Sequence, residues 1–145
     1  MNRIDNLFKT KTKEILSIYF CAGDPTPSCT AEVIRSLQRN GVDMIEIGMP
    51  FSDPLADGPV IQAASTRSLK GGMSVRKLFE QLEGIRKDVT IPLIIMGYIN
   101  PIMQYGFEAF CQKCNEVGVD GLIIGKRRSA SVTDAVMRIS EGAAN

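Results

Sequence analysis

MIEIGMPFSDPLADGPVIQ, at residues 44–62, joins a short apolar run to a turn rich in proline and glycine and then to a helix start at Gly58-Pro59. The run Met44–Gly48 is predicted to be a buried strand, although it contains the acid Glu46. A carboxylate in an apolar strand loses hydration unless it is partnered or faces a cavity, and an unpaired buried charge is costly. Glu46 is therefore the first candidate for a chemical role.

A second acid, Asp57, lies at the far end of the same loop, which can fold back over the carboxyl end of the strand. Two carboxylates in different environments have separated pKa values, so that one can give a proton while the other takes one. The alternative is that Glu46 lies on a solvated strand edge and that Asp53 and Asp57 only form Asx turns. Spacing alone does not decide between these interpretations.

The rest of the chain repeats this alternation of strand and helix. Further strands are predicted at 15–21, 92–98 and 121–125, and helices at 26–41, 59–69, 74–85 and 107–117. An amphipathic segment at 3–12 is expected to cover one end of the sheet. Near-continuous apolar strands separated by helices predict a parallel sheet covered by helices. The pattern fits either four βα units of a TIM barrel or part of an open doubly wound sheet.

Polar residues favour the barrel, because they gather directly after the predicted strands. They lie at Gly23-Asp24, at Ser52–Asp57 and at Asn100, and barrel enzymes carry their chemistry at this end of the strands. No GxGxxG follows the first strand and no GxxxxGK[ST] occurs, which removes the commonest nucleotide sites of open sheets.

Composition indicates one domain with a real core, since the 145 residues are 44% apolar and 23% charged. The formal net charge of +1 provides no electrostatic footprint for nucleic acid or an anionic membrane. The amino terminus has no signal-peptide pattern, and no apolar run approaches the roughly 20 residues of a membrane span. We therefore expect a cytoplasmic protein that binds neither nucleic acid nor membranes.

The four cysteines are expected to be reduced thiols. Cys111 and Cys114 form a CxxC, but they share one face of a predicted helix and no second CxxC accompanies them, so core packing is favoured over a metal or redox site. The chain contains no histidine, which excludes Ser-His and Cys-His nucleophiles.

Four segments carry a resemblance to a known family. They are YFCAGDP at 19–25, IEIGMPFSDPLADGP at 45–59, IPLIIMGYINPI at 91–102 and EVGVDGLII at 116–124. Together they make about residues 1–125 similar to the tryptophan synthase alpha subunit. The resemblance implies a (β/α)8 barrel that cleaves indole-3-glycerol phosphate to indole and glyceraldehyde 3-phosphate. The central signature does not resemble the phosphosugar isomerases of the histidine pathway, a third possibility.

The resemblance also implies roles for single residues. Glu46 matches the catalytic glutamate and Asp57 the catalytic aspartate. Four positions match the wall of the indole pocket: Tyr19, Met96, Tyr98 and Ile123. Asp53 matches a loop residue at the contact with the beta subunit. Without the family, ordinary barrel core is the preferred explanation of the four wall residues. No cofactor is expected on this chain, because pyridoxal phosphate belongs to the beta partner.

After Gly125 the sequence departs from the family. Residues 1–125 are expected to form about half of a barrel and residues 126–145 an atypical helical tail, whereas a full barrel needs about 250 residues. The basic triplet 126–128 either attracts a phosphate or is a solvated face. We expect a truncated alpha chain with little lyase activity alone. The alternative is a non-catalytic half-barrel module that dimerises through open strand edges or docks on the beta subunit.

Overall fold

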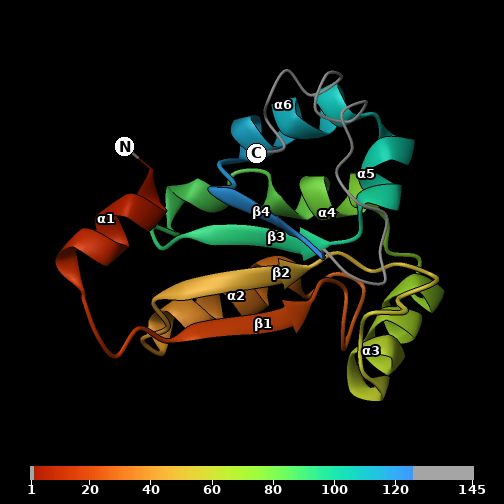
Figure 1. Cartoon of the computed structure of the whole chain (residues 1–145), viewed down its shortest axis with the longest axis horizontal. Coiled ribbons are helices and arrows are strands. Elements are labelled where there is room, and N and C mark those ends of the chain that lie inside the picture. Colours follow the sequence, from red (N-terminus) through yellow and green to blue (C-terminus); the bar gives the residue numbers. More distant parts are fainter. Residues whose placement is uncertain (1, 126–145) are drawn as a thin grey trace.

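Four parallel strands form one sheet whose order follows the sequence (Figure 1). The computed structural model describes residues 2–125, so the expected helical tail and the basic triplet lie outside the described residues. The strands are β1 (Ser17–Cys21), β2 (Met44–Gly48), β3 (Leu93–Gly97) and β4 (Gly121–Ile124). All four predicted strands are confirmed, and β2 has the predicted ends.

One face of the sheet is packed against helices. The side chains of Ile45, Ile47, Leu93 and Ile95 on this face are fully buried. They form the core together with apolar residues of three helices, α2 (Thr30–Arg39), α4 (Val75–Leu82) and α6 (Phe107–Val117). Cys111 and Cys114 of α6 pack against the same core, as predicted, and residues 2–125 contain no cluster of metal-ligating side chains.

The opposite face carries the polar residues of the strands. Tyr19 is paired with Glu46, and Glu46 with Ile94, so these side chains form one row across the sheet. The next row, nearer the strand ends, contains Gly48, Met96 and Ile123. A sequential strand order with the described core on one face is the arrangement of barrel units, because a doubly wound sheet has helices on both faces and a reversal of strand order.

Helix α1 (Arg3–Thr10) covers the amino-terminal end of the strands, opposite the arrowheads (Figure 1). Arg3 forms an ion pair of 2.9 Å with Asp120, and a Cβ placed on Gly121 would lie 3.3 Å from Ile4 Cδ1. The next residue after the helix, Lys11, pairs with Asp43 at 2.7 Å. The prediction that this segment closes one end of the sheet is confirmed.

Two helices have boundaries that differ from the predictions. Helix α2 begins at Thr30 and not at Pro27, because residues 26–29 form a separate turn in which Cys29 N–H donates to the Thr26 carbonyl at 3.2 Å. Helix α4 ends at Leu82, and a short 3₁₀ turn (η1, Ile85–Lys87) follows Gly84, whose φ of 69° is suited to glycine.

Helix α5 (Ile99–Tyr105) was not predicted at all. Asn100 lies directly after the strand predicted at 92–98, and no helix is predicted there, because proline usually ends regular structure. Proline is tolerated in the first turn of a helix, where its missing N–H has no intrahelical partner, and Pro101 occupies such a position. Among residues 2–125, no helix is both long and apolar enough to cross a bilayer.

Candidate active site

The two candidate acids come from β2 and from the loop that follows it. Glu46 lies midway along β2 on the polar face, is half-buried, and accepts a hydrogen bond of 2.8 Å from Ser17 Oγ. Asp57 is also half-buried and ends the acidic loop, residues 49–58, which leads into α3 (Pro59–Lys70). The acidic loop begins at the carboxyl end of β2, where barrel enzymes place their chemistry.

Tyr98 anchors the acidic loop from the end of β3. Its hydroxyl accepts a hydrogen bond from Ala56 N–H at 2.8 Å and contacts Asp57 Oδ2 at 3.4 Å. Its ring packs on Phe51, with 5.1 Å between ring centroids. Tyr98 is only 7% exposed, so these contacts fix both ends of the loop against the sheet.

Helix α3 holds the loop from the other side. Gln62 Nε2 donates to the Asp57 carbonyl at 2.9 Å, and Phe51 N–H donates to Ser65 Oγ at 3.2 Å. The fold therefore presents Asp57 from a loop whose backbone is tied to both β3 and α3.

Tyr19 neighbours both acids, since it is paired with Glu46 across β1 and β2 and lines a small cavity together with Asp57. Burial raises the pKa of its hydroxyl well above the ordinary range, and the charges of Asp57 and Glu46 are among the further causes, together with Cys21 and Tyr98. Strand pairing places Tyr19 next to Glu46, and the acidic loop brings Asp57 to the cavity that Tyr19 lines, so residues far apart in sequence share one region of the polar face.

The space for the Tyr19 ring is made by Gly48. A Cβ placed on Gly48 would overlap the Tyr19 hydroxyl and would lie 2.5 Å from Cζ and 2.7 Å from Cε2. A glycine inside a strand often marks such a close approach. Sequence reasoning missed both Gly48 and Ser17, although period-two alternation puts Ser17 on the same face as Tyr19.

Most of the predicted wall residues surround one small cavity of about 60 Å³. Its lining includes Tyr19, Met96, Tyr98 and Asp57. The lining does not include Ile123, which is 39% exposed on the same face of β4, or Glu46, which sits one row deeper in the sheet. The cavity is smaller than the roughly 300 Å³ at which ligand pockets begin.

Asp53 does not join the other acids. It lies exposed in the acidic loop and accepts a hydrogen bond of 2.6 Å from Ser52 Oγ. Leu55 of the same loop and Val60 at the start of α3 are 69% and 76% exposed. This part of the chain therefore exposes apolar side chains as well as one carboxylate.

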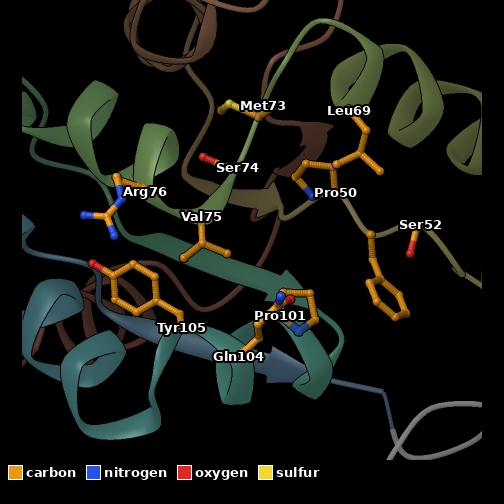
Figure 2. Close-up of a pocket in the computed structure, with 11 residues that line it drawn as sticks. Pro50, Ser52, Leu69, Met73, Ser74, Val75, Arg76, Pro101, Gln104 and Tyr105 are labelled. Carbon is orange, nitrogen blue, oxygen red and sulfur yellow. The ribbon is translucent and has the colours of Figure 1, made fainter.

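A larger hollow of about 490 Å³ borders the acidic loop, and Figure 2 shows the residues that line it. Neither Glu46 nor Asp57 is among them. Three segments line it: the loop with Pro50 and Ser52, the α3–α4 connection and the start of α4 with Met73, Ser74 and Arg76, and α5 with Pro101, Gln104 and Tyr105. Residues of the acidic loop therefore line both the small cavity and this larger hollow.

Replacing Gly48 by alanine is expected to displace Tyr19 and to destabilise the fold by about 1–3 kcal/mol, the usual cost of overpacking. The free energy of unfolding in urea measures this. The same substitution in a Tyr19→Val background should cost clearly less, because the overlapping ring is gone and contacting residues do not add independently. Equal costs in both backgrounds would contradict the contact.

The sequence matches the family model described as tryptophan synthase alpha chain over residues 6–135. Among curated relatives, the tryptophan synthase alpha chain of Phocaeicola vulgatus is 64% identical over 124 residues, which is 86% of this chain and 48% of the relative. That of Flavobacterium johnsoniae is 61% identical over 124 residues, 86% of this chain and 49% of the relative. The chain thus spans about half the length of the curated relatives it matches.

Solved structures agree with the sequence comparison. Tryptophan synthase subunit alpha from Legionella pneumophila superposes with a TM-score of 0.86 at 40% identity, covering 99% of this chain and 56% of that one. The aminoacrylate-bound form of tryptophan synthase from M. tuberculosis superposes with a TM-score of 0.84 at 29% identity, covering 99% and 58%. The described strands and helices are therefore about half of the fold seen in these structures, and the predicted half barrel is confirmed.

Proposed function

Because this chain belongs to the tryptophan synthase alpha chain family, we propose that it supplies the catalytic carboxylates of an indole-3-glycerol phosphate lyase. The observation that carries the proposal is that Tyr19 is paired with Glu46 on the polar face of the sheet and lines, with Asp57, the cavity near the carboxyl ends of the strands. The products would be indole and glyceraldehyde 3-phosphate, and the reaction would serve tryptophan biosynthesis.

The chemistry is a retro-aldol cleavage. Glu46 in its acid form protonates C3 of the indole, and the ring nitrogen takes up positive charge. Asp57 accepts the indole N–H and stabilises that charge. The Glu46 carboxylate then removes the proton of the side-chain hydroxyl next to C3. The bond between C3 and that carbon breaks, its electron pair returns to the ring, and the hydroxyl carbon becomes the aldehyde. Glu46 ends protonated, as it began.

The indole ring would be bound by the residues around the small cavity. Tyr19 and Tyr98 offer aromatic surfaces and Met96 a flexible apolar one. Ile123 lies in the same row as Met96, so it would extend this wall along β4. No cofactor is needed for these steps, since only protons move, and we assign pyridoxal phosphate to the partner subunit. A cytoplasmic location remains part of the proposal.

A hybrid protein tests the activity. Residues 1–125 of this chain are joined to the carboxyl-terminal half of the Phocaeicola vulgatus relative, to which this chain is 64% identical over 124 residues. We expect the hybrid to release indole from indole-3-glycerol phosphate, and the 145-residue chain alone to release little. The intact relative serves as the positive control. A folded hybrid that releases no indole would overturn the proposal.

We also propose that the exposed part of the acidic loop docks on a tryptophan synthase beta subunit. Leu55 and Val60 expose large apolar side chains, Asp53 of the same loop exposes a carboxylate, and exposed apolar surface commonly marks protein contacts. The larger hollow that borders the loop offers room for partner side chains. In a pull-down with the beta subunit, Leu55→Asp and Asp53→Ala should reduce capture. Asp88→Ala should not, because Asp88 directly follows η1 and pairs with Arg35 of α2, outside the acidic loop. Capture that is unchanged in all three variants would contradict this surface.

The second candidate function is a self-associating module without catalysis. It is favoured by the unpaired outer edges of β1 and β4 within residues 2–125, and by the exposure of Ile123. Sedimentation at two protein concentrations distinguishes the candidates. The module is favoured if the 145-residue chain forms a concentration-dependent dimer and the hybrid releases no indole. A chain that is monomeric at both concentrations would exclude the module.

A further inference from the structure

The hydroxyl of Tyr19 has no protein partner within residues 2–125, although polar groups surround it. None of the hydrogen bonds among these residues uses it, whereas the neighbouring Tyr98 hydroxyl bonds to Ala56 and contacts Asp57. Tyr19 lines the small cavity and is only half-buried, so its hydroxyl is open to whatever enters there. A polar group held in a site without a partner is available for a ligand.

Gly48 and the strand pairing fix where this hydroxyl lies. The Tyr19 ring extends from β1 across Gly48 of β2, one row nearer the strand ends than Glu46. The hydroxyl is thus carried from the row of Glu46 towards the acidic loop that presents Asp57. Burial and the neighbouring charges hold the pKa of this hydroxyl above the usual range, so the phenol stays protonated. It is a neutral donor in the neighbourhood of two acids.

The two acids restrict the chemistry of the atom that this donor can bind. A carboxylate or phosphate oxygen of a ligand would be repelled by Glu46 and Asp57. An alcohol oxygen is not repelled, because it accepts from Tyr19 and can donate its own proton to a carboxylate. A carbonyl oxygen formed from that alcohol can still accept from Tyr19. The position therefore suits an oxygen that changes from hydroxyl to carbonyl.

We propose that Tyr19 is a specificity-determining residue whose hydroxyl donates a hydrogen bond to an alcohol oxygen on the side chain of the indole ligand. The inference rests on the proposed function, and it adds a polar contact to a residue otherwise assigned only to the wall. A ligand with the same ring and phosphate but a plain alkyl chain would leave this donor without a partner. A neutral hydrogen bond corresponds to about a 3- to 10-fold difference in affinity.

Ligand fluorescence tests this directly, because the chain contains no tryptophan and all indole emission comes from the ligand. Indole-3-glycerol phosphate and its analogue with an unsubstituted propyl chain are titrated with the 145-residue chain, with Tyr19→Phe and with Tyr105→Phe. Tyr105 lies in α5 and lines the other hollow, so it is the matched control. Chromatography after each titration verifies that the ligand is intact.

The chain and Tyr105→Phe should bind the glycerol ligand about 3- to 10-fold more tightly than the propyl analogue. Tyr19→Phe should bind both equally, with unchanged affinity for the analogue. If Tyr19→Phe weakens both ligands alike, or neither, the inference is wrong while the indole site stands. If the unmodified chain binds neither ligand, both the inference and the proposed indole site fail. The hybrid assay then still reports on the lyase activity separately.

Discussion

Replacing Glu46 by glutamine in the hybrid protein should lower the rate of indole release by about 10²- to 10⁴-fold, the contribution typical of a general acid–base group. Glutamine keeps the size of the side chain, and its amide oxygen can still accept the hydrogen bond that Ser17 Oγ makes to Glu46 at 2.8 Å. It cannot give or take a proton at neutral pH. The loss therefore isolates proton transfer from packing.

The effect should fall on kcat, with KM changed little, because the amide fills the same space next to the bound ring. Glu32→Gln is the matched control, since Glu32 lies exposed on α2 and, within residues 2–125, forms an ion pair only with Arg39, at 2.9 Å. We expect it to retain full activity. A Glu46→Gln hybrid that keeps more than about a tenth of the rate would remove Glu46 from the mechanism.

Replacing Asp120 by alanine should destabilise the chain by about 3–5 kcal/mol, the usual cost of removing one partner of a buried ion pair. Asp120 immediately precedes β4, and its side chain is 3% exposed. It accepts hydrogen bonds from Arg86 Nη2 at 2.6 Å, from Arg3 Nη1 at 2.9 Å and from Leu93 N–H at 2.9 Å. One carboxylate thus connects β3, β4, η1 and α1.

Without Asp120, the Arg86 guanidinium would keep its hydrogen bonds to the carbonyls of Gly118 and Ile91 but would lose its counter-charge. Since folded domains are stable by only about 5–15 kcal/mol, the variant should unfold at a much lower urea concentration. Asp88→Ala is the control, because it removes only the exposed pair with Arg35 and should cost no more than about 1 kcal/mol. Similar urea midpoints for the two variants would contradict the assigned role.

The order of strands and helices could be predicted because it depends on patterns within short segments. Met44–Gly48 is apolar enough to be a strand whatever surrounds it, and Gly118, with a φ of 80°, ends α6 where the sequence predicted. The failures also have local causes. Pro101 lies within a helix, although proline usually ends regular structure, and Thr26-Pro27 begins a turn, although the helix is predicted from residue 26. Each of these motifs is compatible with a helix or with a turn until packing selects one.

The sequence by itself determined the alternation of strands and helices, the acid within β2 and the acidic loop after it, because apolar periodicity and turn residues act over a few positions. Only the tertiary structure decided that Gly48 makes room for the Tyr19 ring, that Tyr98 anchors the loop at Ala56, and that Asp120 connects four elements. These contacts join residues distant along the chain. Their geometry follows from strand register and loop closure, which no short stretch of sequence specifies.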